Sequence, residues 1–511
     1  MALLLLMSGF ALRSQETRSL RVLLTAETRA ALEPLDPYTL RPRGGSWARL
    51  STILRAQAGT GAPTLLLDGG GTLQGDPVAA IRALTRPDLP DPVVAVMSRL
   101  GYHGLVPGRR DLSFGLETLT RADDQAPFPV LCANLVHRTT QKPAFAAYAV
   151  HELGGLRIGV IGLTSEAPES PELLLRDPVE TARSLERTLR KDESVHLVFA
   201  LLREAQPRTL GSRLAKEVPG LDLLVGGESI GDRHLGGPTG SGSVGLAELT
   251  LAREKDRIKV HSVKVQSIPV AEETPLDAQV TAVTQPQRRV TDTYLDTFVT
   301  HLGQDLDGRW ARMEDTPIAQ LMHRAARQAT GADLTALPVP PPRYYVPTGP
   351  ATVRQLWALA PDEDRLVVIS VEGRQLKAYL EHAFRIYRPS HEPELFQRGL
   401  GPGDMDLVHG VSFAVDLGKP VGSRILNLRF RGKPVTPEQT FTLALLSRRL
   451  DDDGGYLTAV GWTGSPLRRT DTSYRNVLLG FALAQPTLTL EVSQPWRTIP
   501  WLDRERVAAQ Q

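Results

Sequence analysis

Leu65–Gly75 reads Leu-Leu-Leu-Asp-Gly-Gly-Gly-Thr-Leu-Gln-Gly, and this stretch indicates the fold of the chain. Three apolar residues lead into Asp68, and a cluster of glycines follows. This order predicts a buried parallel strand whose carboxyl end runs into a tight loop. Ligands of α/β sheets bind at that edge of the strands. We therefore expect an α/β sheet with a functional site close to Asp68.

Length and composition exclude several classes of protein. A chain of 511 residues is long enough for two or more domains, each with its own core. The net charge of +2 indicates no strong field for nucleic acid or membrane, so no nucleic-acid partner is expected. The single cysteine, Cys132, excludes an intrachain disulfide and a cysteine-based metal site. Its apolar surroundings predict a buried, inert thiol.

The first residues form an apolar run, Met1–Leu12, that ends at Arg13. The run is too short for an ordinary membrane-spanning helix, and no integral membrane span is expected. It resembles the apolar part of a signal peptide but has no basic segment before it, and a truncated or misassigned start is the alternative. Residues 1–18 are therefore interpreted as a signal-like or disordered N-terminus. A periplasmic or secreted location and a cytoplasmic one both stay open.

Strand-like and helix-like patterns alternate over residues 19–268, which predicts layers of an α/β domain. The predicted strands are Arg21–Thr25, Thr64–Asp68, Gly104–Val106, Val130–Ala133, Tyr148–Leu153, Ile158–Gly162, His196–Leu202 and Leu221–Val225. The predicted helices are Gly44–Ala58, Val93–Leu100, Pro178–Arg190 and Leu210–Glu217. A hairpin of Val244–Leu251 and Ile258–Val265 closes this domain.

The pattern then changes. Residues 269–315 are predicted to be a helical linker, with the helix at Gln287–Asp307. A second domain is expected at 316–490, opening with a helix at Pro317–Thr330, where proline occupies a first-turn position. Residues 491–511 are interpreted as a tail.

The quoted stretch resembles the D-x-G-D-T-x-Q-G loop of the metallophosphoesterase fold found in 5′-nucleotidases and in the thiosulfohydrolase SoxB. Further fragments match in order over most of Arg21–Gly455, among them I-G-V-I-G-L-T in the first domain. The second domain contributes G-A-D-L-T-A-L (331–337) and V-E-G-R-Q-L-K-A-Y-L-E (371–381). The resemblance implies a metallophosphoesterase-like α/β sandwich followed by a 5′-nucleotidase C-terminal α+β domain.

Members of that family hold two divalent ions, which generate a hydroxide nucleophile. The aligned positions in this chain are poorly suited to hold them. The first metal motif aligns to Glu27 and Arg29, and the bridging aspartate to Gly71, which has no side chain. The remaining ligands align to Arg109, Arg110, Arg203, Glu228 and Ile230. An arginine side chain has no acceptor for a cation. The resemblance therefore implies a degenerate site, with no metal, no other cofactor and no catalytic residue assigned.

Four of the aligned positions are arginines: Arg29, Arg109, Arg110 and Arg203. If the alignment holds, they point into one cleft, where their paired N–H donors suit phosphate, sulfate or carboxylate. The alternative interpretation is that they pair with the carboxylates of Glu27, Asp68, Asp111 and Glu228 and fill an inactive site.

In the second domain, 5′-nucleotidases stack a base between aromatic rings beside an N-G-G-x-R loop. The equivalent stretch here is P-V-P-P-P-R-Y-Y (338–345). Arg343, Tyr344 and Tyr345 are therefore candidates to contact a planar or anionic ligand. Packing within the loop is the alternative role for the two tyrosines.

Fold alone does not decide function. The first hypothesis is a non-catalytic homologue that binds a small oxyanion, a nucleotide-like ligand or a protein partner. The alternative is a divergent hydrolase of phosphate or sulfur esters, such as a nucleotide or a thiosulfate-related substrate.

Overall fold

The computed structural model describes residues 17–166, 170–204, 209–227, 232–238, 240–254, 257–508 and 510. These residues form two compact units, which divide between Arg289 and Val290. Each unit is described by itself.

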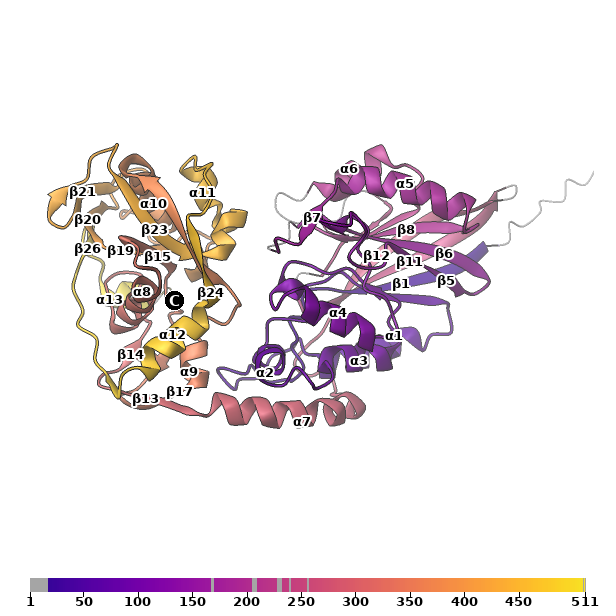
Figure 1. Ribbon diagram of the computed structural model, residues 1–511, viewed down its shortest axis with the longest axis horizontal. Helices are drawn as coiled ribbons and strands as arrows, with labels where there is room; N and C mark the ends of the chain where they lie inside the picture. Colours follow the sequence, from indigo (N-terminus) through magenta and orange to yellow (C-terminus); the bar gives the residue numbers. More distant parts are fainter. Residues whose placement is uncertain are drawn as a thin grey trace, which may run out of the picture. The chain divides into compact units, whose positions relative to one another are not determined.

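Unit 1 contains strands and helices in alternation (Figure 1). Its strands are β1 (Thr17–Thr25), β2 (Thr64–Asp68), β3 (Gly104–Leu105), β4 (Leu135–His137), β5 (Tyr148–Leu153), β6 (Leu156–Thr164), β7 (Leu173–Leu175), β8 (Leu197–Arg203), β9 (Leu223–Gly226), β10 (His234–Leu235), β11 (Ser243–Glu254) and β12 (Arg257–Pro269). Its helices are α1 (Trp47–Ala58), α2 (Pro77–Thr85), α3 (Pro92–Leu100), α4 (Leu116–Gln125), α5 (Pro178–Lys191) and α6 (Leu210–Glu217).

Two five-stranded sheets form the centre of unit 1, in the orders β12-β11-β1-β2-β3 and β10-β9-β8-β6-β5. Strand alternation sorts the side chains between layers. Leu65 and Leu67 of β2 enter the core between the sheets, where Phe199 of β8 also lies. Leu66 points to the opposite side, toward α1 to α4. Val198 packs toward α5 and α6. Helices therefore cover both outer faces of a sheet sandwich (Figure 1).

The strand predicted at Thr64–Asp68 is confirmed with the same bounds. The strand predicted at Val130–Ala133 is wrong, because Val130 and Leu131 make only isolated bridges. Helices α2 and α4 were not predicted from the sequence. For α2 the signals were present, since Asp76 caps the helix and Pro77 occupies its first position.

The helix predicted at Gln287–Asp307 is wrong in its position. Helix α7 runs over Ala278–Leu295 and contains Pro286. Asp277 begins it by accepting hydrogen bonds from the backbone N–H groups of Gln279 and Val280. Phe298–Leu302 and Leu306–Asp307 form strands instead. A proline inside a helix usually marks a boundary, and here it does not.

Unit 2 combines small sheets with helices. Its strands are β13 (Phe298–Leu302), β14 (Leu306–Asp307), β15 (Leu334–Pro338), β16 (Tyr345–Val346), β17 (Gly349–Thr352), β18 (Arg365–Glu372), β19 (Asp406–His409), β20 (Val411–Asp416), β21 (Ile425–Phe430), β22 (Lys433–Pro434), β23 (Thr440–Leu446), β24 (Arg468–Ser473), β25 (Thr487–Leu488) and β26 (Trp496–Ile499). Its helices are α8 (Pro317–Thr330), α9 (Val353–Trp357), α10 (Gly373–Ala383), α11 (Tyr456–Ala459), α12 (Tyr474–Leu483) and α13 (Arg504–Ala508).

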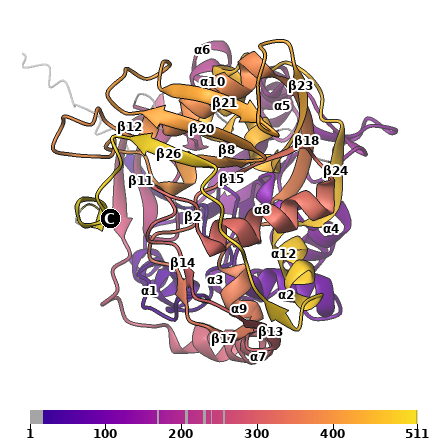
Figure 2. The same cartoon turned by 90° about the vertical axis from the view of Figure 1, so that its left-hand side faces the viewer.

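The two larger sheets of unit 2 have the orders β19-β15-β23-β18-β24 and β22-β21-β20-β26. Their apolar faces share one core with α10, in which Phe384, Phe413 and Trp496 are buried. Figure 2 looks onto the face of unit 2 that carries α8, β20, β21 and β26.

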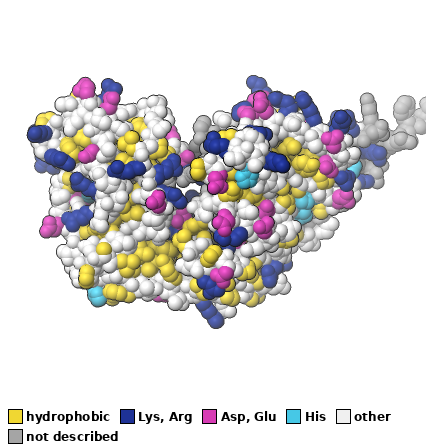
Figure 3. All heavy atoms as spheres, in the orientation of Figure 1, with side chains coloured by type: hydrophobic (Ala, Val, Ile, Leu, Met, Phe, Trp, Pro, Cys, Tyr) yellow, Lys and Arg dark blue, Asp and Glu magenta, His cyan; other side chains and the backbone are white. Residues whose placement is uncertain are grey.

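The surface of each unit carries mixed charges. Basic and acidic side chains alternate with apolar ones over the visible face, as Figure 3 shows. Among the residues that the structure describes, no helix has the length and apolar character needed to cross a bilayer.

Candidate functional site

The candidate site of unit 1 lies where strands of both sheets end. Strand β1 ends at Thr25 beside Asp68 of β2, and the two strands run parallel. In the second sheet, Thr164 of β6 lies beside Arg203 of β8, again in parallel strands. Parallel strands present their carboxyl ends at one edge, so the loops that follow them meet there.

The loops after β1 and β2 are bonded to each other along their backbones. Glu27 N–H donates to Gly70 O at 2.8 Å, and Arg29 N–H donates to Gly71 O at 3.0 Å. Glu27 and Arg29 have φ angles of 54° and 53°, and Gly70 and Gly71 have φ angles of 80° and 69°. This left-handed backbone is costly for residues with a Cβ atom and explains the glycines at 70 and 71.

Asp68 stabilises the loop from the end of β2. Its carboxylate accepts hydrogen bonds from Thr25 Oγ1 at 2.6 Å, Gly70 N at 2.8 Å and Thr72 Oγ1 at 2.9 Å. The side chain is completely buried. Burial raises the pKa of Asp68 to about 7, although the three hydrogen bonds oppose the shift. Asp68 therefore holds the loop together and does not face solvent.

Asp111 stabilises the same loop from the other side. It follows Arg110 in a short 3₁₀ turn, Arg110–Leu112. Its carboxylate accepts four backbone N–H groups at 2.7 to 2.9 Å, from Gly71, Thr72, Leu73 and Gly108. Burial raises the pKa of Asp111, and these hydrogen bonds act against the rise. Neither Asp68 nor Asp111 pairs with the arginines in the way that the filled-site interpretation predicted.

Arg203 occupies the centre of the site. Its guanidinium forms an ion pair with Glu27 through Nη2, and its Nε donates to Glu166 Oε1 at 2.8 Å. The three side chains are between 14% and 19% exposed. Burial acts to raise the pKa of Glu27, but the charge and hydrogen bond of Arg203 outweigh burial and lower it. The pKa of Arg203 is raised, because Glu166 and Glu27 together outweigh its desolvation.

The other arginines lie around the same carboxylates. Arg29 Nε is 3.5 Å from Glu27 Oε2, and its side chain is 54% exposed. The charges of Arg110 and Arg29 also contribute to lowering the pKa of Glu27. The backbone N–H of Arg109 donates to Glu166 Oε2 at 2.5 Å. Glu228 and Ile230 lie outside the described residues.

Glu166 was missed by sequence reasoning. It stands two residues after the end of β6, at the same sheet edge as Arg203. A polar residue just beyond a buried parallel strand is the signal that could have identified it.

The side chain of Glu27 lies directly against the backbone of Gly71. A Cβ atom added to Gly71 would lie 2.6 Å from Glu27 Oε1 and 3.0 Å from Oε2. The carboxylate of Glu27 therefore fills the space in which a side chain at position 71 would begin.

The candidates of unit 2 lie at the end of the loop that leads from β15 into β16, and Tyr345 is the first residue of β16. Tyr344 OH donates to Gln355 O at 2.7 Å, and Tyr345 OH donates to Asp305 Oδ2 at 2.8 Å. Arg343 is exposed. Both tyrosine hydroxyls are thus bonded within unit 2, and Tyr345 is 52% exposed.

Residues 292–461 match the family described as 5′-nucleotidase, C-terminal domain. The chain carries a 5′-nucleotidase C-terminal domain. A similar protein is the 2′,3′-cyclic-nucleotide 2′-phosphodiesterase/3′-nucleotidase of Haemophilus influenzae, which is 23% identical over 83% of this chain and 79% of its own length. The family resemblance stated from the sequence is therefore confirmed.

Solved structures share the fold of this chain over both of its domains. A putative 5′-nucleotidase of Staphylococcus aureus has a TM-score of 0.76 and 17% identity, over 94% of this chain and 99% of its own. SoxB of Thermus thermophilus has a TM-score of 0.58 and 18% identity, over 94% and 96%. The predicted fold, a metallophosphoesterase-like α/β sandwich followed by the 5′-nucleotidase C-terminal domain, is confirmed.

The donor atoms at the sheet edge do not fit the dinuclear metal centre that the fold family implies. Glu27 is paired with Arg203, Asp68 and Asp111 are saturated by the loop, and Gly71 has no side chain. Within the described ranges, no group of three or more histidine, cysteine, aspartate or glutamate side chains is placed to hold a metal ion. Guanidinium groups surround Glu27 instead, and they repel cations.

Proposed function

We propose that this chain is a non-catalytic homologue of the 5′-nucleotidase and SoxB proteins, which acts by binding a ligand or partner. The observation that carries the proposal is the position of Glu27. Its carboxylate fills the space at Gly71 and is neutralised by Arg203 and Arg29. A bridging carboxylate must face two cations, whereas this one faces cations that the chain itself supplies.

A small oxyanion or a nucleotide-like molecule is the ligand class that this site would take. Arg29 supports this part of the proposal because its side chain is 54% exposed and only 3.5 Å from Glu27 Oε2. An oxyanion at the mouth of the site would receive the paired N–H groups of Arg29. Arg203 is held by Glu27 and Glu166 and would contribute its charge rather than its hydrogen bonds.

Metal content and hydrolysis test the loss of catalysis. We expect the purified chain to contain far less than one equivalent of manganese, zinc or iron by elemental analysis. Hydrolysis of nucleotides and of p-nitrophenyl phosphate should stay at background with added metal, beside an active 5′-nucleotidase as a positive control. Two equivalents of bound metal together with turnover that a chelator abolishes would favour the divergent hydrolase instead.

Thermal unfolding tests the anion site. Sulfate, thiosulfate or phosphate should raise the melting temperature more than chloride at equal ionic strength, since a ligand at a hundred times its Kd stabilises a fold by about 2.7 kcal/mol. Arg29→Ala should reduce this difference. Arg121→Ala is the matched control, because Arg121 is a partly exposed arginine of α4 that pairs with Glu117. If both variants keep the full difference, Arg29 binds no anion.

A further inference from the structure

A basic pocket lies within unit 2 and shares no residue with the site described above. It has a volume of about 360 Å³ and is lined by α8, β15 and the ends of β19, β20 and β21. An adjoining pocket of about 480 Å³ shares Arg324, Arg327 and Arg431 with it. Volumes in this range are typical of sites for small molecules. All these residues belong to unit 2, so the pocket does not depend on the arrangement of the two units.

Four arginines surround the two pockets: Arg324, Arg327, Arg429 and Arg431. In the described part of the chain, none of the four has a carboxylate oxygen within 4.0 Å. Their hydrogen bonds go to neutral groups. Arg324 Nε donates to Gln320 Oε1 at 3.3 Å, and Arg429 Nη1 donates to Gly432 O at 3.0 Å. Their charges therefore stay available to a ligand.

One carboxylate, that of Asp333, lines the larger pocket. It is already bonded to Thr442, whose N–H and Oγ1 donate to Asp333 Oδ2 at 3.0 and 2.7 Å. These bonds lower the pKa of Asp333, and the charges of Arg431 and Arg327 lower it further. A single carboxylate offsets one of the four arginine charges, so the lining is cationic.

Two histidines line the smaller pocket together with the arginines. The rings of His323 and His409 stack with centroids 3.7 Å apart and planes 3° from parallel. His323 is 3% exposed, and its Nδ1 shares a hydrogen bond of 2.7 Å with Thr335 Oγ1. Burial lowers the pKa of His323 well below its ordinary value, and the neighbouring His409 adds to this. Burial therefore disfavours the charged form of His323. The carboxylate of Asp315, with its Oδ1 3.4 Å from His409 Nε2, is buried beside the histidines and does not line the pocket.

Arg431 stands in an unfavourable backbone conformation at this pocket. It is the first of two residues that link β21 to β22, with φ of 49°, and Gly432 follows with φ of 76°. Such a turn favours asparagine, aspartate or glycine at both places. The arginine side chain therefore does not stabilise the turn, but it adds a positive charge to the lining of the pocket.

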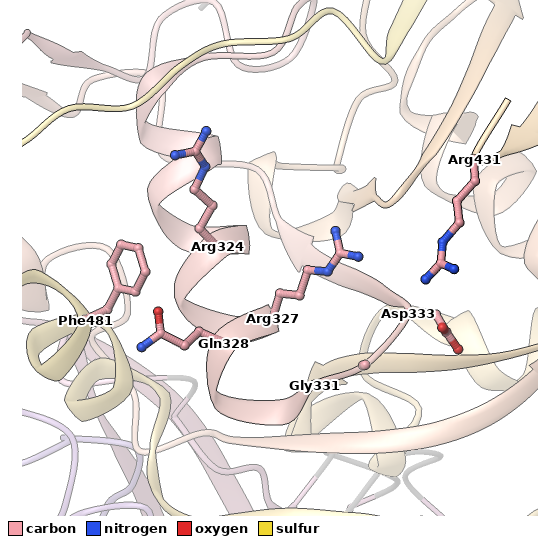
Figure 4. Close-up of a pocket in the computed structure, with 8 residues that line it drawn as sticks. Arg324, Arg327, Gln328, Gly331, Asp333, Arg431 and Phe481 are labelled. Carbon is pink, nitrogen blue, oxygen red and sulfur yellow. The ribbon is translucent and has the colours of Figure 1, made fainter.

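We propose that this pocket binds a small molecule that carries two phosphoryl groups. Arg327 and Arg431 extend toward one another from α8 and from the end of β21, above Asp333 (Figure 4). Arg324 stands on α8 three residues before Arg327 and also lines both pockets. Guanidinium groups bind phosphoryl oxygens through paired N–H donors. Arginines that come from two elements suit a ligand with two anionic groups better than a single phosphate.

Calorimetric titration of the full chain with inorganic pyrophosphate, without divalent metal, tests the proposal. We expect pyrophosphate to bind at least tenfold more tightly than orthophosphate, because two groups are held. Arg327→Ala and Arg431→Ala should each weaken pyrophosphate binding by about tenfold or more, the loss expected for a hydrogen bond to a charged group. Arg398→Ala is the control, since Arg398 is 85% exposed and lies outside both pockets.

The variants also separate this pocket from the site of unit 1. Arg29→Ala should leave the pyrophosphate affinity of unit 2 unchanged, whatever happens to anion binding in unit 1. Circular dichroism and melting temperature confirm that each variant is folded. Equal affinity of the wild type, Arg327→Ala and Arg431→Ala would overturn the proposal, as would equal affinity for pyrophosphate and orthophosphate.

Discussion

Arg203 connects the two sheets of unit 1 through ion pairs. It belongs to β8 of the second sheet, and its partner Glu27 follows β1 of the first sheet. Its other partner, Glu166, follows β6. A charge held away from water needs such partners, because removing one of them leaves the other uncompensated. The triad of Arg203, Glu27 and Glu166 therefore contributes to the stability of the sheet edge, whatever the site binds.

Glu27→Gln tests this role. The substitution removes a charge from a largely buried pair, so we expect the free energy of unfolding to fall by about 1–3 kcal/mol. The control is Glu152→Gln, because Glu152 pairs with Arg157 but is 71% exposed. That variant should change stability by less than about 0.5 kcal/mol. Urea denaturation of both variants measures the difference, and equal losses would contradict a special role for the triad.

Asp68 makes stability depend on pH. Its pKa of about 7 in the folded chain exceeds the value of 3.8 expected without the fold. Between these values the folded chain holds a proton that the unfolded chain has released. Stability from this residue is therefore lost as the pH rises, with a slope near 1.4 kcal/mol per pH unit for one proton.

Asp68→Asn removes this proton equilibrium. The free energy of unfolding of the wild type, minus that of the variant, should fall as the pH rises from about 4 to about 7. Denaturation at a series of pH values, at constant ionic strength, gives the two curves. A constant difference across this range would show that Asp68 is ionised throughout.

At the scale of elements, the tight connection between β21 and β22 contains Arg431, which has a strained backbone and also lines the pocket of unit 2. Arg431 occupies a left-handed position without the glycine or asparagine that such a turn favours. Strained residues of this kind persist where the surrounding structure or a function requires them.

Arg431→Asn should therefore stabilise unit 2 while it weakens pyrophosphate binding. We expect a gain of about 0.5–1 kcal/mol in the free energy of unfolding, because asparagine adopts this conformation at lower cost. Arg431→Lys keeps a long basic side chain and should leave stability unchanged. Thermal or urea unfolding measures both, and a loss of stability in Arg431→Asn would show that Arg431 makes contacts that outweigh the strain.

At the scale of the whole molecule, helix α7 spans the division between the two units. Its first half is fixed to unit 1, where Glu33 accepts hydrogen bonds from Thr284 and Arg288. Its second half is fixed to unit 2, where Arg354 pairs with Asp292 of the helix and with Asp296, the residue just after it. Each half thus has its anchors within its own unit.

We expect residues 1–289 and 290–511 to fold as separate fragments, because each unit has its own core. Differential scanning calorimetry should give one cooperative transition for each fragment, within a few degrees of a corresponding transition of the intact chain. A fragment without a cooperative transition would show that its unit depends on the other.

The sequence by itself determined the layers of unit 1 and the shape of its central loop. The apolar run at Leu65–Leu67 and the glycines after Asp68 act through local backbone preferences and strand alternation, which need no knowledge of distant residues. The local signals for α2 were present and were not used, and the helix placed at Gln287–Asp307 begins earlier, at Ala278, with Pro286 inside it.

Only the tertiary structure decided which charges meet. Glu166 reaches Arg203, and Asp111 turns to the loop amides, although the sequence grouped Asp111 with the arginines. Arg327 and Arg431 share one pocket across more than a hundred residues of chain. Ion pairs and pockets act through space between separate elements, so no periodicity or spacing along the chain records them.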